Sequence, residues 1–210
     1  MTTGATVTDG NAFRDRSADQ TSSTLLARVQ AQEPDAWHRL VQLYGPLVYR
    51  WCRQGGFQEA DAADVGQDVF QAVFKAIGSF QHHQQGASFR GWLRTIVRNK
   101  IRDFIRRKRP GGDGVGGSDA EAKLLELADS AGNEPENPAG PSDEHVLFRR
   151  AVDLVLLEFA EETRQAFLRV VVEEQEPAAV AEALGISVNA VYLAKSRVKR
   201  RIRQEFQGLL

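Results

Sequence analysis

The sequence predicts an all-α protein of two small helical domains joined by an acidic Gly/Pro-rich linker, the second domain containing a helix-turn-helix. Apolar residues recur three and four positions apart in several segments, and no alternating Val/Ile/Thr run indicates a strand. The 210 residues are 42% hydrophobic and 26% charged. This ordinary globular composition excludes a wholly disordered, collagen-like or coiled-coil chain.

Residues 1–21 are polar and aperiodic and are expected to form a disordered tail. The first domain is expected over residues 22–109, with helix-capping residue types at 22–24. Pro34 suits the first turn of the second helix, whose apolar face continues until Gly55. We expect Pro46 to restart this helix. The apolar face consists of Trp37, Leu40, Val41, Tyr44, Leu47, Val48, Trp51 and Cys52.

A third helix is expected from Glu59 or Asp61 to Ile77, ending at Gly78. Its predicted buried residues are Val65, Val69, Val73, Phe74 and Ile77. After a polar loop at 80–87, Ser88 caps a helix of about 22 residues, or about 33 Å, that ends before Pro110.

The linker is expected over residues 110–142, with a short helical segment at 119–129. The second domain, residues 143–210, begins with a helix that Ser142 or Asp143 starts, followed by a helix over 163–173. Residues 177–184 and 188–206 then form the helix-turn-helix. Gly185 supplies the positive φ of its turn and Ser187 caps the second helix, with Val191 and Val198 expected to anchor it against Val180 and Leu184.

Charge is segregated along the chain although the net charge is −1. Residues 90–109 contain nine basic residues and one acidic residue, and residues 195–203 contain six basic residues and no acidic one. Between them, residues 113–144 contain nine acidic residues and one lysine. Two basic segments on either side of an acidic one indicate nucleic-acid binding at two places.

The second helix of the helix-turn-helix has the residue types of a major-groove reader. Arginines such as Arg197 and Arg200 suit guanine edges, whereas Lys199, Arg201 and Arg203 suit phosphates. A helical hairpin with a solvated charged face is the alternative. The outward positions are Asn189, Ala190, Tyr192, Leu193, Ser196, Arg197 and Arg200.

The helix after Ser88 interleaves arginines with Phe89 and Trp92, which combines phosphate attraction with surfaces for base stacking. Each aromatic taken singly is expected in the core. The preceding loop, which includes His82, His83 and Gln84, offers hydrogen-bonding groups for a flipped-out base.

Asp61, Asp64 and Asp68 lie along one face of the third helix. A protein-binding face is the preferred interpretation, and a nuclease-like metal site is the alternative. Adjacent histidines without Cys or carboxylate partners do not predict a metal site.

Taken in order, DAADVGQDVF, SFRGWLRTIVRNKIRDFIRRKRP, the acidic linker and the helix-turn-helix resemble an extracytoplasmic-function sigma factor of bacterial RNA polymerase. The resemblance covers about residues 24–109 and 145–206. It implies that the first domain binds the polymerase clamp helices and melts the minus-ten promoter element, and that the second reads the minus-thirty-five element. Gly66 and the pair Tyr192–Leu193 depart from the usual pattern of the family.

The resemblance assigns these roles to matching positions. Polymerase binding falls on Asp61, Asp64, Gln67, Asp68 and Phe70. The minus-ten surface falls on His82, His83, Gln84, Ser88, Arg90, Trp92, Arg94, Arg98, Asn99 and Arg102. The minus-thirty-five reader falls on Tyr192, Leu193, Ser196, Arg197 and Arg200, and Ser187, Asn189 and Lys199 complete that predicted interface.

The implied partners are core RNA polymerase, promoter DNA and an anti-sigma factor or other inhibitor, with no cofactor, metal or direct membrane insertion. A single cysteine, the absence of a signal peptide and the lack of a long apolar run favour a cytoplasmic protein. The alternatives are a one-component helix-turn-helix transcription regulator and a metal-dependent enzyme using the three aspartates. No catalytic triad or phosphate-binding loop motif indicates an enzyme.

Overall fold

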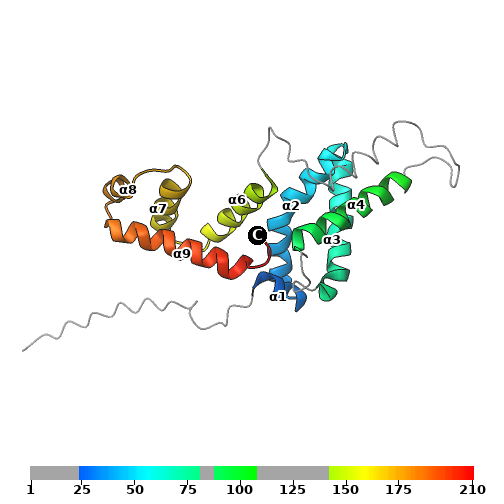
Figure 1. The fold of residues 1–210 in the computed structure, drawn as a ribbon, viewed down its shortest axis with the longest axis horizontal. Coiled ribbons are helices and arrows are strands. Elements are labelled where there is room, and N and C mark those ends of the chain that lie inside the picture. Colours follow the sequence, from blue (N-terminus) through cyan, green and yellow to red (C-terminus); the bar gives the residue numbers. More distant parts are fainter. Residues whose placement is uncertain (1–23, 81–87, 108–141) are drawn as a thin grey trace, which may run out of the picture.

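The computed structural model describes residues 24–80, 88–107 and 142–210 (Figure 1). All regular elements in these three ranges are helices, which confirms the predicted all-α class. The expected N-terminal tail, the acidic linker with its helix at 119–129, and the loop containing His82, His83 and Gln84 lie outside the described residues.

The first helical group consists of α1 (Leu25–Gln30), α2 (Pro34–Gln54), α3 (Glu59–Ala76), the 3₁₀ turn η1 (Ile77–Ser79) and α4 (Phe89–Arg107). The Thr24 side chain caps α1 by accepting from the amide of Ala27 at 3.3 Å. The α-helical part of α3 ends at Ala76, slightly before the predicted end. On α4 every fourth residue is buried, so its apolar stripe and its arginines occupy different faces. The stripe is Phe89, Leu93, Val97, Ile101 and Ile105.

Helix α2 runs unbroken through Pro46, so the prediction that this proline restarts the helix is wrong. Proline has no N–H and therefore leaves the carbonyl four residues earlier, that of Gln42, without its helical donor. Arg150 of α6 (Asp143–Leu156) supplies the missing donor, since its Nε lies 2.8 Å from the Gln42 oxygen. A residue 108 positions away therefore compensates the proline.

The second helical group contains α6, α7 (Glu161–Val171), α8 (Pro177–Leu184) and α9 (Val188–Phe206). Ser142 caps α6 by accepting from the amide of His145 at 3.2 Å, which confirms the predicted start of this helix. Helix α7 begins two residues earlier than expected, whereas α8 and α9 have the expected bounds.

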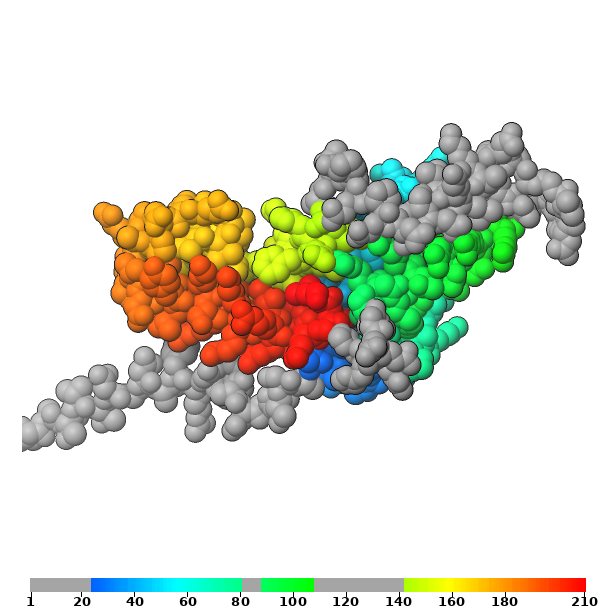
Figure 2. Space-filling view, viewed as in Figure 1, coloured from blue at the N-terminus to red at the C-terminus, as the bar shows by residue number. Residues whose placement is uncertain are grey.

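The two helical groups share one apolar core. In the space-filling view their surfaces lie against each other (Figure 2). Helix α6 packs on α2, and the C-terminal part of α9 packs on α6 and α1. Residues from both groups are almost fully buried together, among them Leu43 and Leu47 of α2, Leu147 of α6 and Phe206 of α9. Val198 also belongs to this shared core, which corrects the prediction that it anchors α9 on α8.

Polar contacts complete the surface where α6 and α9 meet α2, which we call the seam. The buried hydroxyl of Tyr44 on α2 donates to the carbonyl of Leu209. Burial raises the pKa of this hydroxyl, against the opposing effect of the Arg90 charge, so it stays protonated as the bond requires.

A charge network lies at the other end of the seam. Glu205 on α9 is 3% exposed, and its carboxylate pairs with Arg39 of α2 and with Arg201 one turn earlier on α9. Glu158 pairs with the same two arginines. A carboxylate this deeply buried is stable only because both arginines neutralise and hydrogen-bond it.

Replacing Glu205 by Gln is expected to lower the free energy of unfolding by about 1–3 kcal/mol, because Arg39 and Arg201 then lose the buried one of their two charged acceptors and keep only Glu158. Urea unfolding followed by circular dichroism measures this change. Glu182→Gln on the exposed surface of α8 is the control, with an expected change within about 0.5 kcal/mol. Equal effects of the two substitutions would show that the network contributes nothing to stability.

Candidate nucleic-acid and protein interfaces

The predicted helix-turn-helix has the required geometry. Helix α8 ends at Gly185, whose φ of +65° is left-handed, and the Ile186 amide closes the turn on the carbonyl of Ala181 at 3.0 Å. Ser187 then caps α9 by accepting from Ala190 N at 3.1 Å, and the helix axis turns by 105° between α8 and α9.

A small apolar cluster holds α8 against α9. Val180 and Ala181 of α8 are buried with Val191 and Ala194 of α9, and Leu184 packs against them. The predicted anchoring of Val191 against Val180 and Leu184 is therefore confirmed. Because Ala181 and Ala194 are small, the two helices approach closely.

The opposite face of α9 is open to solvent. Tyr192 is 54% exposed and Leu193 is 46% exposed, which is unusual for large apolar side chains without a partner. The polar members of the predicted minus-thirty-five reader are also exposed, namely Asn189, Ser196, Arg197, Lys199 and Arg200. Ser187 is exposed as well, but its hydroxyl is engaged in the cap. The structure thus brings these predicted residues together on one accessible face.

The arginines of α4 recur every fourth residue at positions 90, 94, 98 and 102 and are all partly exposed. The Nε atoms of Arg94 and Arg98 are buried, and neither has a hydrogen-bond partner among the described residues. Asn99 is exposed, and the Ser88 hydroxyl accepts from the Gly91 amide at 3.0 Å, as expected for a helix start. This row matches the predicted minus-ten surface.

Two of these arginines already have partners in the second helical group. Arg94 Nη2 lies 2.7 Å from Asp143 Oδ2, and Arg90 Nη2 lies 3.0 Å from Glu144 Oε1. The same Asp143 oxygen accepts from Trp51 Nε1 at 2.9 Å. No local pattern predicts these pairs, because Asp143 and Glu144 indicate only acidic residues that are favourable at a helix N-terminus.

Trp92 is partly buried in an aromatic cluster with Phe80 and Phe89, at ring-centroid distances of 5.1 and 5.4 Å. Phe89 is 1% exposed and belongs to the core, as expected for each aromatic taken singly. Trp92 therefore borders the arginine row and is held in position by core residues.

The acidic residues of α3 do not gather into a metal site. Asp68 pairs with Arg107 of α4 at 2.7 Å, whereas Asp64 and Gln67 are exposed. In the described ranges, no group of three or more His, Cys, Asp or Glu side chains could hold a metal ion. The structure therefore gives no support to the metal-site interpretation of the three aspartates.

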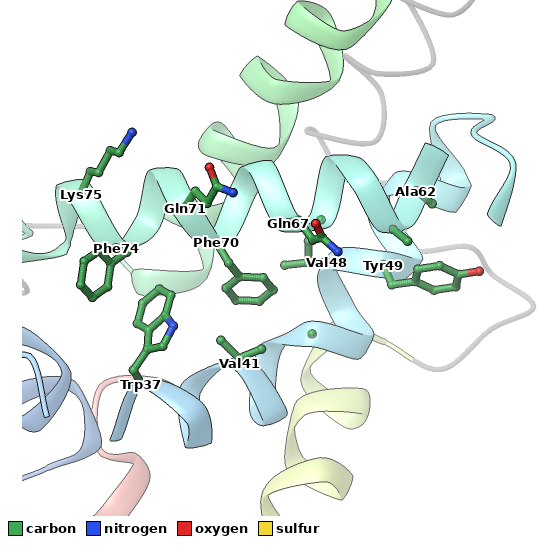
Figure 3. A pocket seen from close by; sticks show the side chains of 13 residues that line it. Trp37, Val41, Val48, Tyr49, Ala62, Gln67, Phe70, Gln71, Phe74 and Lys75 are labelled. Carbon is green, nitrogen blue, oxygen red and sulfur yellow. The ribbon is translucent and has the colours of Figure 1, made fainter. Parts of the chain in front are cut away.

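Beside this acidic edge lies an apolar groove between α2 and α3, with a volume of about 570 Å³ (Figure 3). Trp37 stands between Phe70 and Phe74 and makes edge-on contacts with them at centroid distances of 6.3 and 5.2 Å. Phe74 was predicted to be buried, but it is 47% exposed because it faces this groove rather than the core.

Two residues of the predicted polymerase-binding surface line this groove, and their role stays a prediction. Gln67 and Phe70 line it, and Trp37 and Tyr49 of α2, which the sequence-based prediction missed, complete its walls. Gly66 also lines the groove, and a Cβ at this position would meet no atom within 4 Å. The missing side chain of Gly66 therefore keeps this part of the groove open.

Cys52 carries no chemistry of its own in the folded state. It is fully buried, and burial raises the pKa of its thiol to about 12. The thiolate required for nucleophilic or metal-binding chemistry is thus absent at neutral pH.

Among the described helices, no single one is long and apolar enough to cross a bilayer. The bent pair of α8 and α9 passes a test of length and composition alone, and these are the two helices of the helix-turn-helix.

Part of the chain is similar to known proteins. Residues 40–110, which include most of α2 and all of α3 and α4, match the family model for sigma-70 region 2. The chain is 39% identical over 87 residues to the ECF RNA polymerase sigma factor BldN of Streptomyces coelicolor, covering 40% of this chain and 31% of BldN. The chain is therefore similar to extracytoplasmic-function sigma factors.

Two further relatives show how far the similarity extends. The ECF RNA polymerase sigma factor SigE of Mycolicibacterium smegmatis is 35% identical over 79 residues, covering 38% of this chain and 29% of SigE. The RNA polymerase sigma factor CnrH of Cupriavidus metallidurans is 28% identical over 172 residues, covering 80% of this chain and 84% of CnrH. The chain therefore spans less than a third of BldN and SigE but most of CnrH.

Gly185→Ala is expected to lower the free energy of unfolding by about 1–2 kcal/mol, because a Cβ strains a left-handed backbone. Gly66→Ala is the matched control, since its Cβ also meets open space but its backbone is helical. This control is expected to stabilise the protein by up to about 1 kcal/mol. Urea unfolding measures both, and a neutral Gly185→Ala would mean that the turn does not depend on its left-handed residue.

Proposed function

We propose that this chain is a sigma factor, which binds core RNA polymerase and directs promoter-specific initiation by contacting two promoter elements. The observation that carries the proposal is the presence of two separate basic surfaces, the arginine row of α4 and the exposed face of α9, on one chain that matches sigma-70 region 2. The predicted domains, residues 22–109 and 143–210, each contribute one of them. Sigma factors are initiation factors, so no catalytic step is assigned to the chain itself.

The second helical group is proposed to read duplex DNA at the minus-thirty-five element. Helix α9 projects Arg197 and Arg200 from a face that the turn at Gly185 leaves uncovered. Arginine recognises guanine by donating two hydrogen bonds to O6 and N7 in the major groove. Lys199, on the same helix, is suited to a phosphate contact that positions the reader.

The first helical group is proposed to hold the minus-ten element. The α4 arginines attract the phosphates, and Trp92, fixed by Phe80 and Phe89, offers the edge of an aromatic cluster for base contact. The loop with His82, His83 and Gln84 is proposed as the pocket for the flipped base.

Polymerase binding is proposed to use the groove between α2 and α3. Its apolar walls of Trp37, Phe70 and Phe74 suit a partner helix with apolar residues, and nearby Asp61 and Asp64 suit basic residues beside them. An anti-sigma factor or other inhibitor is proposed as a further partner of this chain.

Gel filtration of the full chain with core polymerase tests the proposal, and co-elution is the expected result. Phe74→Ser should weaken the complex about tenfold, because a half-exposed aromatic wall of the groove is lost. Leu157→Ser is the control, since Leu157 is 72% exposed on the other helical group. A chain that binds DNA as a dimer and never co-elutes with polymerase would instead be a one-component regulator.

Arg197→Ala is expected to weaken binding to the preferred minus-thirty-five duplex by about 1–3 kcal/mol and to relax base choice at one position. Arg203→Ala is the control and should weaken all duplexes alike, as loss of a phosphate contact does. Fluorescence anisotropy on duplexes selected from a random library, with each base pair varied, measures both. Equal losses on every duplex would identify Arg197 as a phosphate contact.

A further inference from the structure

The carboxylate of Asp143, at the start of α6, lies in a socket formed by α2 and α4. Its side chain is 12% exposed, and it receives hydrogen bonds from Arg94 at 2.7 Å and from Trp51 at 2.9 Å. Arg50 adds an ion pair at 3.8 Å, and the Arg94 guanidinium lies over the Trp51 ring, 5.1 Å from its centroid. A carboxylate with two arginines and an indole N–H around it makes the contacts that a phosphate would make there.

The next residue extends this contact along α4. Glu144 pairs with Arg90 at 3.0 Å, one helical turn before Arg94. Two consecutive acidic side chains thus bind two consecutive members of the arginine row, while the buried Nε atoms of Arg94 and Arg98 have no partner among the described residues. Asp143 and Glu144 therefore bind part of the arginine row of α4 and leave some of its N–H donors without an acceptor among the described residues.

The seam holds these carboxylates in place. Arg150, two turns further along α6, donates to the Gln42 carbonyl that Pro46 leaves open, and Tyr44 bonds the carbonyl of Leu209. The start of α6 therefore reaches the arginines only while α6 and α9 remain packed on α2.

We propose that Asp143 and Glu144 act as an intramolecular competitor of nucleic acid, so that DNA binding at α4 is coupled to release of α6 from α2. This inference rests on the proposed function in one respect, namely that the α4 row is a nucleic-acid surface. The Nη2 hydrogen of Arg94 that points at Asp143 is not available to a phosphate, and the negative charges of Asp143 and Glu144 repel a phosphate at the same arginines. DNA must therefore displace the acidic pair, and displacement removes the contact between the start of α6 and the first helical group.

The coupling is reciprocal. If α6 docking weakens DNA binding by a given factor, DNA weakens α6 docking by the same factor. Typical couplings of this kind lie between about 5-fold and 150-fold. Removing both carboxylates is therefore expected to raise the affinity of the row for a single-stranded oligonucleotide at least about fivefold.

The first measurement is fluorescence anisotropy of the full chain with a labelled dT20 oligonucleotide. The test variant is Asp143→Asn/Glu144→Gln. The control is Asp153→Asn/Glu162→Gln, which makes the same change in net charge at exposed residues that have no ion-pair partner among those described. Tighter binding of the test variant than of the control supports the proposal, and equal affinities overturn it.

Glu144→Gln alone keeps the test decisive if the double variant folds poorly. The Glu144 side chain is 76% exposed, so its substitution leaves the fold intact, which thermal unfolding checks. The single variant should bind the oligonucleotide about twofold more tightly than wild type. No gain over Asp153→Asn would again overturn the proposal.

The second measurement detects the separation of the second helical group from the first. It uses fluorescence energy transfer between dyes at Gln71→Cys on α3 and Ser196→Cys on α9. Both positions are exposed, whereas Cys52 is buried and stays unlabelled. Addition of dT20 should lower transfer efficiency, and unchanged efficiency at saturating oligonucleotide would overturn the coupling. Neither measurement involves polymerase. Failure to co-elute with polymerase would therefore contradict the proposed function without contradicting the coupling between oligonucleotide binding and release of α6.

Discussion

The attachment of the second helical group depends on a carbonyl that cannot be satisfied within α2. Pro46 removes the N–H that would bond Gln42, and a buried carbonyl without a donor is costly. Arg150 of α6 donates to it at 2.8 Å. This bond joins α6 to α2, and Asp143 at the start of the same helix accepts a hydrogen bond from Trp51 of α2.

Apolar packing and charged pairs contribute differently at the seam. The shared apolar core stabilises the packing without direction, whereas the charged pairs at Arg39 and Arg94 select one register of α6 and α9 on α2. Charged pairs can be exchanged for other charged partners, but apolar surface can only be covered or exposed. A separated form would therefore have to bury part of this surface elsewhere.

Most helix boundaries were predictable because their determinants are local. Ser142, Ser187 and Gly185 act on amides or carbonyls within four residues, so the pattern alone indicates their role. The fate of Pro46, Phe74 and Asp143 was not predictable, because each depends on partners brought together only by tertiary packing. Asp143, for example, is 49 positions from Arg94 and 92 from Trp51.

The same distinction applies to the candidate surfaces. The exposed face of α9 follows from helical periodicity and one turn, and its exposed residues were predicted one by one. The groove between α2 and α3 needs two helices at a particular distance, so Trp37 and Tyr49 gave no signal beyond ordinary apolar spacing. The sequence pattern of one helix predicts only the residues that this helix contributes to such a groove, and not those of the facing helix.

The burial of Cys52 bears on how oxidative stress could reach this protein. A thiol reacts with peroxide as the thiolate and only when it is accessible, and Cys52 meets neither condition in the folded chain. Sulfenic acid formation or glutathionylation at this residue would require local unfolding of α2. Any redox sensing in which the folded protein takes part must therefore begin on another molecule.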